Sequence, residues 1–251
     1  MVKSASRVLE LLEMFTEEPD SLALSDVARG LNLPKSSTQA LLQTLVARGY
    51  LLKAGFGYEI DPALKDEQIT GRAYWHLTRM ARPIMEESAL IAGETAVLSI
   101  LAPDFSVRYI AKSLSPNAIR HDPALCSPRP PHSCSPGLLF LAFLPEAALN
   151  EWFRTAKLEK FAQNTITDPK ILRKTLLKFR EQGYSESIDG YINGAAGVCF
   201  PIQNTFGRML ATLHLSAPTD HYLQKKDLLL KEARRASAEM IKKLQTVSKA
   251  D

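Results

Sequence analysis

The sequence predicts an α/β fold of the α+β type: a small helical domain with a β-hairpin, a connecting helix, and a larger domain with an antiparallel sheet. Three observations predict it. Residues 24–60 follow the order helix, turn, helix, strand, turn, strand, and residues 69–92 carry one apolar stripe at helical spacing. Residues 95–216 contain several strand-like segments bounded by turn residues. With 251 residues, the chain is long enough for two hydrophobic cores.

The first domain is predicted from Leu24–Lys53. Ser25 is expected to cap a short helix, and Pro34 to occupy the first position of a second helix, where a missing N–H costs nothing. In that second helix, a stripe at helical spacing is expected to be buried, and it consists of Thr38, Leu41, Leu42, Leu45 and Val46. Two strands around the turn at 54–57 complete the pattern of a winged helix-turn-helix, which favours this interpretation over an ordinary helical core.

The opposite face of the second helix carries small and amide side chains, which suit contact with DNA. Glutamine can bond adenine through two hydrogen bonds in the major groove, and hydroxyl groups near a helix N-terminus suit phosphates. The candidate DNA-binding residues are Lys35, Ser36, Ser37, Gln39, Gln43, Arg48 and Lys53. Residues 1–62 hold six Lys or Arg against eight Asp or Glu, which is not the basic composition typical of a DNA binder. Modest affinity per protomer would require a dimer.

A helix connecting the two domains is predicted between Ile69 and Ala92. Its apolar stripe consists of Leu77, Met80, Ala81, Ile84 and Met85. Pro83 should kink this helix or separate two helices. The stripe fits pairing between two protomers as well as packing on the chain's own domain.

The second domain is predicted to alternate strands and helices. Strands are expected at 95–101 and 107–111, and again at 184–189, 197–203 and 208–216. Residues 123–136 hold five prolines and should form an irregular loop. Ser135 is then expected to cap a helix that Pro136 begins, Asp168–Pro169 to open another helix, and residues 220–247 to form a basic C-terminal helix whose charges are solvated.

Five segments in this order resemble the IclR family of bacterial transcriptional regulators. They are the first helix with Arg7–Leu12, the segment 24–53, the run from Arg82 to Leu98, the motif from Pro131 to Ala142, and the segment from Gly183 to Ile202. The resemblance implies a winged helix-turn-helix at 1–64, a linker helix at 65–92 and a GAF-like effector-binding domain at 93–251. It also implies double-stranded operator DNA, a small organic effector, and assembly as a homodimer or homotetramer.

By motif position, the effector-binding residues would be Ser135, Pro136, Gly137, Ser187, Asp189, Gly197 and His214. The helix that follows Ser135 should present unpaired N–H groups and the positive end of its dipole, which suit a carboxylate. An inward His214 would pair with an anion or donate to a carbonyl; a core histidine satisfied by the backbone or by Asp189 is the alternative.

Four positions depart from the family pattern. Ala40 stands where the family often has Arg, and Leu138 replaces the usual Lys. Gly190 and Gly197 stand where Glu and Cys are usual. The loss of both side chains, with His214 opposite the helix N-terminus, is expected to favour a larger carboxylated ligand, such as an aromatic acid, over an acid of two or three carbons.

Other function classes are less well supported. The sequence contains no phosphate-binding glycine loop, no nucleophile elbow and no metal-spaced His/Glu pair, so we expect no enzyme and no cofactor. A small-molecule hydrolase using His132 with Cys134, or His214 with Asp189, and a ligand-free winged-helix interaction module remain the alternatives. Cys126, His132 and Cys134 would be a weak zinc set, and free cysteines in a reducing cytoplasm are favoured. No membrane span or signal peptide is expected.

Overall fold

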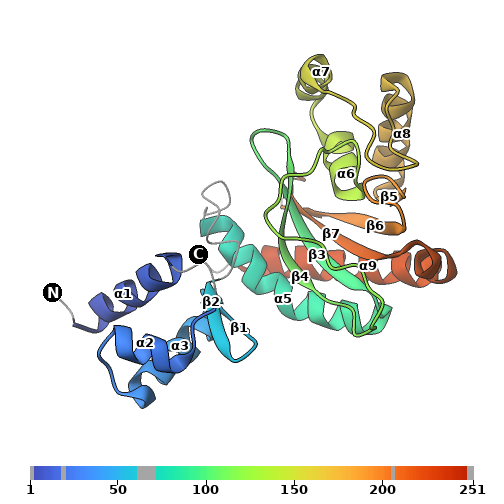
Figure 1. The fold of residues 1–251 in the computed structure, drawn as a ribbon. Coiled ribbons are helices and arrows are strands. Elements are labelled where there is room, and N and C mark those ends of the chain that lie inside the picture. Colours follow the sequence, from blue (N-terminus) through green and yellow to red (C-terminus); the bar gives the residue numbers. More distant parts are fainter. Residues whose placement is uncertain (1–2, 18–20, 61–71, 205–206, 248–251) are drawn as a thin grey trace. The chain divides into compact units, whose positions relative to one another are not determined.

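The computed structural model describes residues 3–17, 21–60, 72–204 and 207–247. They form two compact units, Met1–Arg79 and Met80–Asp251. The first unit contains three helices and a β-hairpin, and the second contains a five-stranded antiparallel sheet with helices (Figure 1). The predicted α+β class is therefore confirmed. The predicted linker helix runs from one unit into the other.

The first unit is a helix-turn-helix followed by a hairpin. Its elements are α1 (Lys3–Glu17), α2 (Leu24–Gly30), α3 (Lys35–Ala47), β1 (Leu51–Ala54) and β2 (Gly57–Ile60). The strands pair from Leu51 opposite Ile60 to Ala54 opposite Gly57, which leaves a two-residue turn at Gly55 and Phe56. The buried core consists of Leu11, Phe15, Val27, Leu42, Leu45, Leu51 and Ile60, so all three helices and both strands contribute to it.

Two predicted helix starts were wrong, that of α2 by two residues and that of α3 by one. Helix α2 begins at Leu24 with Ala23 as its N-cap and without a side-chain cap, so Ser25 lies in the first turn. Pro34 is the N-cap of α3 rather than its first residue, because its ψ of 141° is outside the helical range. Of the predicted buried stripe of α3, Thr38, Leu42 and Leu45 are buried, whereas Leu41 and Val46 are only half-buried.

The linker helix is α5 (Arg72–Ala92), which agrees with the predicted segment where the structure describes it; residues 69–71 lie outside the described residues. Pro83 lies inside this helix, so the predicted alternative of two separate helices is wrong. Leu77, Ala81, Ile84 and Met85 of the predicted stripe are buried, and Met80 is half-buried. The stripe therefore packs within this chain, as the second of the two interpretations expected.

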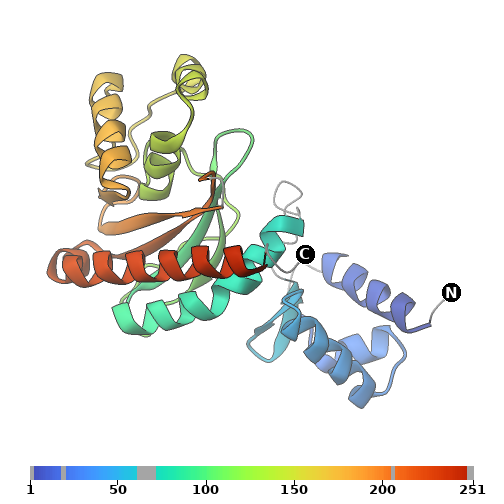
Figure 2. The ribbon, with the colours of Figure 1, turned by 180° about the vertical axis from the view of Figure 1, so that it is seen from behind.

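The sheet of the second unit is antiparallel throughout, in the order β4-β3-β7-β6-β5. Its strands are β3 (Thr95–Leu101), β4 (Val107–Ser113), β5 (Ser185–Ile188), β6 (Ala195–Gln203) and β7 (Met209–Pro218). The C-terminal helix α9 (Thr219–Val247) runs beside α5 on one face of this sheet (Figure 2). Ser88 Oγ of α5 donates to the carboxylate of Glu232 on α9 (2.7 Å), which ties the two helices together.

The other face of the sheet carries α6 (Ser135–Phe143), followed by α7 (Glu146–Thr155) and α8 (Pro169–Gln182). Asp168 caps α8 by accepting from the N–H groups of Lys170 and Ile171, and Gly183 ends it in the left-handed conformation (φ 80°), as the sequence predicted. Helix α7 was not predicted. These three helices share a buried apolar cluster of Leu138, Leu141, Ala142, Leu149, Trp152, Leu172, Leu176 and Phe179.

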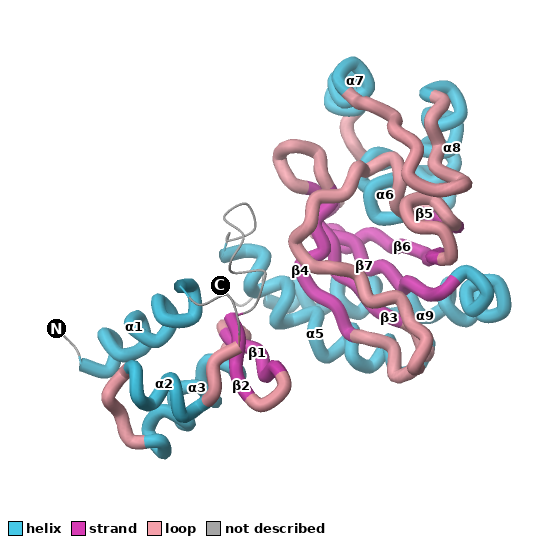
Figure 3. The backbone as a smooth tube through the Cα atoms, in the orientation of Figure 1, coloured by secondary structure: helices cyan, strands magenta, loops and turns pink. Residues whose placement is uncertain are grey.

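A long irregular loop connects β4 to α6, and we call residues 114–134 the β4–α6 loop (Figure 3). It contains four of the five prolines that predicted an irregular segment. Ser135 is the first residue of α6 and Cys134 is its N-cap, without a side-chain hydrogen bond, so the predicted capping by Ser135 was wrong. This loop forms one wall of the site described next.

Candidate functional site

The exposed surface of α3 matches the face predicted to contact DNA. Ser36, Gln39, Ala40 and Gln43 recur at helical spacing and are all exposed. The other candidate side chains, Lys35, Ser37, Arg48 and Lys53, are exposed as well. Lys35 begins α3, Arg48 is its C-cap and Lys53 lies on β1, so basic side chains are present at both ends of the helix.

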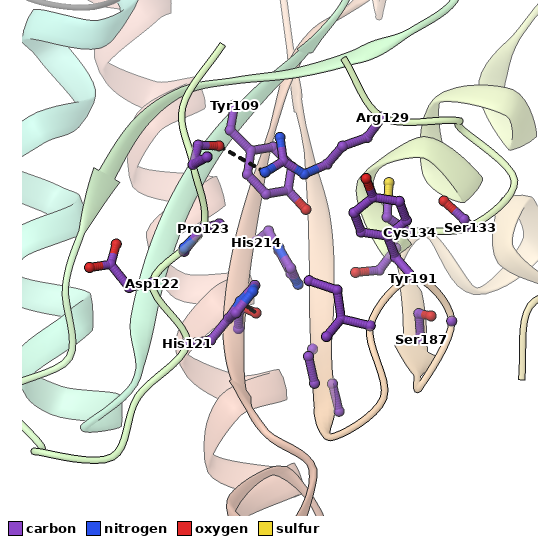
Figure 4. A pocket seen from close by; sticks show the side chains of 18 residues that line it. Tyr109, His121, Asp122, Pro123, Arg129, Ser133, Cys134, Ser187, Tyr191 and His214 are labelled. Carbon is purple, nitrogen blue, oxygen red and sulfur yellow. Dashed lines mark hydrogen bonds between the residues drawn. The ribbon is translucent and has the colours of Figure 1, made fainter. Parts of the chain in front are cut away.

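A cavity of about 290 Å³ lies in the second unit between the sheet, the β4–α6 loop and the start of α6 (Figure 4). Its wall combines aromatic and aliphatic side chains with a small number of polar groups. The lining residues are Tyr109, His121, Asp122, Pro123, Ala124, Arg129, Ser133, Cys134, Ser135, Ser187, Gly190, Tyr191, Ile192, Ala195, Ala196, Gly197, His214 and Ser216. This composition is typical of small-molecule sites, and the volume lies at the small end of their range.

The structure brings together four of the seven residues predicted to bind an effector. Ser135, Ser187, Gly197 and His214 all line the cavity. Ser135 is buried, and its carbonyl accepts a hydrogen bond from Ser185 Oγ (2.6 Å). The cavity wall thus joins the start of α6 to three different strands of the sheet.

The other three predicted residues do not line this cavity. Pro136 is buried at the second position of α6. Gly137 faces the loop, because a Cβ at this position would lie 2.3 Å from the Pro131 carbonyl oxygen. Asp189 has a positive φ of 53°, which turns its carboxylate away to accept from Gly194 N–H (2.8 Å) and Thr219 Oγ1 (2.9 Å).

The N-terminus of α6 offers fewer free donors than predicted. Pro136 has no N–H, and the Gly137 N–H is directed to the Cys134 sulfur. Among the first three residues of α6, only Ser135 therefore has a backbone N–H that is neither missing nor directed to the Cys134 sulfur. The helix dipole remains favourable for an anion, but backbone donors alone do not make a carboxylate site here.

Arg129 is the cavity residue that the sequence interpretation missed. Only 6% of its surface is exposed, and its guanidinium carbon lies 3.9 Å from the centre of the Tyr109 ring. Its Nη1 and Nη2 donate to the carbonyls of Ser127 (2.9 Å) and Ala124 (2.8 Å). Among the described residues, no carboxylate forms an ion pair with it. A buried guanidinium balanced by two carbonyls and an aromatic ring is a ready partner for an anion.

His214 lies on β7, where it pairs with Val97 of β3 and Cys199 of β6 in the middle of the sheet. It is 5% exposed, and neither ring nitrogen has a hydrogen-bond partner within the described part of the chain. The predicted alternative of a core histidine satisfied by the backbone or by Asp189 is therefore wrong. Burial, together with the charges of His121 and Arg129, lowers the pKa of His214 to about 3, so the imidazole is neutral near pH 7.

The two glycines of the cavity wall do not enlarge it, contrary to the prediction. A Cβ on Gly197 would lie 2.2 Å from His214 Nε2, so the imidazole already fills the space of the missing side chain. A Cβ on Gly190 would lie 2.2 Å from Ser187 Oγ and 2.6 Å from the Ser133 carbonyl oxygen. Glycine at these positions permits close packing, and the expected gain of room for a larger ligand does not follow.

The β4–α6 loop also connects the cavity to the end of the linker helix. Ser115 Oγ and Asn117 Nδ2 both donate to the carbonyl of Gly93 (2.7 and 2.8 Å), directly after α5. Thr95 Oγ1 donates to the carbonyl of His121 in the cavity wall (2.6 Å). One continuous segment therefore contacts both the cavity and the residue that follows α5.

His132 and Cys134, one of the two pairs named for catalysis, do not form a catalytic pair. His132 Nε2 lies 2.9 Å from the Glu159 carbonyl, and burial raises the pKa of the Cys134 thiol to about 11, which opposes a thiolate nucleophile. Cys126, Cys134 and Cys199 carry no disulfide. Across residues 3–17, 21–60, 72–204 and 207–247, no cluster of three His, Cys, Asp or Glu side chains is arranged to hold a metal ion. In the same residues, no helix is long and apolar enough to cross a membrane.

Comparison with known proteins places this architecture in one family. Residues 4–55 match the family model of the IclR helix-turn-helix domain, and residues 73–243 match that of the bacterial transcriptional regulator IclR C-terminal domain. The chain is 27% identical over 221 residues to the HTH-type transcriptional regulator XynR of Escherichia coli K12, covering 87% of each chain. It is 26% identical over 246 residues to KdgR of the same strain, covering 95% of this chain and 93% of KdgR.

Solved structures share the fold over nearly the whole chain. The crystal structure of Thermotoga maritima IclR superposes with a TM-score of 0.60 at 22% identity, covering 96% of this chain and all of that one. An IclR homologue from Microbacterium hydrocarbonoxydans, crystallised with 4-hydroxybenzoate, gives a TM-score of 0.64 at 24% identity, covering 96% of this chain and 99% of that one. Because two family models together match most of its length, the chain belongs to the IclR family of transcriptional regulators.

Proposed function

We propose that this chain binds operator DNA through α3 and the β1–β2 hairpin, and that a small carboxylate bound in the cavity modulates this binding. The proposed domains are 1–64 for DNA binding, 65–92 as linker and 93–251 for the effector. Two protomers, as a dimer or within a tetramer, would place two DNA-binding domains on a pseudo-palindromic site. A DNA partner implies action in the cytoplasm.

The observation that carries the effector proposal is the buried guanidinium of Arg129 in the cavity wall. Burying a cation without a paired anion is costly, and a bound carboxylate would remove that cost while forming charge-assisted hydrogen bonds. The β4–α6 loop gives the site a physical connection to the end of α5 through Gly93. A ligand-free interaction module would have no use for either feature.

Binding to DNA is tested with a duplex obtained by selection from a random pool. Because phosphate contacts release counterions, affinity should fall steeply between about 50 and 200 mM salt. Affinity that does not change with salt, or a selection that enriches no sequence, would refute the DNA-binding proposal.

The effector proposal is tested with a panel of small carboxylates, by thermal shift and by their effect on binding to the selected duplex. Arg129→Gln should weaken carboxylate binding by about tenfold or more, since a hydrogen bond to a charged group contributes about 1.5–3 kcal/mol. Arg108→Gln is the matched control, because Arg108 lies on β4 and also donates to a loop carbonyl, that of Cys126 (2.8 Å), but does not line the cavity. If no carboxylate changes DNA binding, or if both variants respond alike, the proposal fails.

A further inference from the structure

We propose that the effector is a hydroxycarboxylic acid and that His214 binds its hydroxyl group while Arg129 binds its carboxylate. This inference rests on the proposed function and adds a second polar group to the ligand. It also assigns His214 a role different from the pairing with an anion that the sequence predicted.

The first argument is the unfilled hydrogen-bonding capacity of His214. Both ring nitrogens are buried and without a partner in the described part of the chain. A neutral imidazole has one N–H donor and one acceptor nitrogen, and leaving buried polar atoms unpaired costs stability. Because the imidazole lines the cavity as well as packing against Gly197, a ligand atom can reach the ring. A hydroxyl group suits either nitrogen, since it can donate and accept.

The second argument is the division of charge between the two groups. Arg129 is a permanent cation in the same wall, and its charge disfavours a second cation at His214. A carboxylate therefore gains most at Arg129, where a planar donor fork is available. The neutral imidazole is left for an uncharged polar group. His214 is thus a specificity-determining residue for the hydroxyl rather than an anchor for the anion.

The third argument concerns the size and character of the skeleton that joins the two groups. Arg129 and His214 both lie next to the Tyr109 ring, with the guanidinium carbon 3.9 Å and the imidazole centre 6.3 Å from the ring centre. The two side chains are therefore close enough for one small molecule to contact both. The remaining wall includes Tyr191 and Ile192, which suit an apolar skeleton. A single aromatic ring with a carboxylate and a hydroxyl has this character.

The experiment uses the full chain and compares benzoate with 3- and 4-hydroxybenzoate by calorimetry. At least one hydroxybenzoate should bind the wild type at least tenfold more tightly than benzoate. His214→Phe keeps a ring but removes both hydrogen-bonding nitrogens, so it should abolish the preference for a hydroxybenzoate over benzoate. His214→Gln, which offers a donor and an acceptor, should restore part of the preference even if His214→Phe does not fold. His132→Phe is the control, because His132 is equally buried but does not line this cavity.

The outcomes separate this inference from the proposed function. If His214→Phe weakens benzoate and the hydroxybenzoates equally, the role of His214 is structural and the inference is wrong. It is equally wrong if the wild type does not prefer a hydroxybenzoate, or binds none of the three acids. In either case the proposed function stands as long as another carboxylate binds in an Arg129-dependent manner and changes DNA binding.

Discussion

The burial of His214 predicts a specific loss of stability in mild acid. In the folded state the pKa of this imidazole is lowered to about 3 by burial, whereas in the unfolded chain it returns to about 6.5. Between these values the unfolded state binds a proton that the folded state does not. The contribution of His214 to the free energy of unfolding is therefore fully present above pH 6.5 and declines as the pH falls toward 3.

The magnitude follows from the titration of the unfolded chain. The pKa of the imidazole in the unfolded chain lies about 1.5 units above pH 5, whereas His214 in the folded state is still neutral at that pH. This difference corresponds to about 2 kcal/mol of lost stability. This value does not depend on the exact folded pKa as long as it lies well below 5. The loss is about a fifth of the stability of a typical domain, which is large enough to measure.

The assay is denaturant unfolding of the wild type and of His214→Asn at pH 8 and pH 5. Other groups titrate alike in both proteins, including His121, whose pKa is also lowered by burial. The wild type should therefore lose about 2 kcal/mol more than the variant between the two pH values. His214→Phe, a second variant without a titrating group at this position, should agree with His214→Asn. Equal losses in all three proteins would refute the assignment of a buried neutral histidine.

Three further predictions concern other parts of the chain. Gln39→Ala or Gln43→Ala should cost about 1–3 kcal/mol on the selected duplex and flatten base preference; equal loss on random DNA in an anisotropy titration would mean backbone contacts only. Gly197→Ala should destabilise the second unit by about 1–3 kcal/mol in denaturant unfolding, because the new methyl would lie 2.5 Å from the Leu215 carbonyl oxygen as well as against His214; an unchanged midpoint would contradict this. Asp168→Ala should cost about 1 kcal/mol, because α8 loses its cap, and Asp168→Asn should recover most of it in the same assay.

Much of the fold could be predicted because its elements have strong local signals. The spacing of Leu77, Ala81 and Met85 specifies a helix whatever surrounds it, and Asp168 with Gly183 marks both ends of α8. Helix α7 has a weaker signal. It is short, and only Leu149 and Trp152 are buried in it, so its stability depends on the cluster it shares with α6 and α8.

The cavity was harder to predict because its geometry depends on contacts between distant segments. Asp189 follows the alternation of β5 in sequence, but a positive φ directly after the strand breaks that alternation. Gly197 indicates missing volume, yet only the tertiary structure shows that the ring of His214 fills it. Arg129 did have a signal in the sequence, because it is the single charged residue in the proline-rich segment 123–136. A basic residue without a function would be unusual in such a segment.

Pro83 has a mechanical consequence for the linker helix. It stands four residues after Arg79, at the border between the two units. Because proline carries no N–H, position 83 cannot donate the backbone hydrogen bond that an ordinary residue would add to this turn. A helix bends most readily at such a turn. The helix that continues from one unit into the other is therefore most easily bent in the turn that contains Pro83.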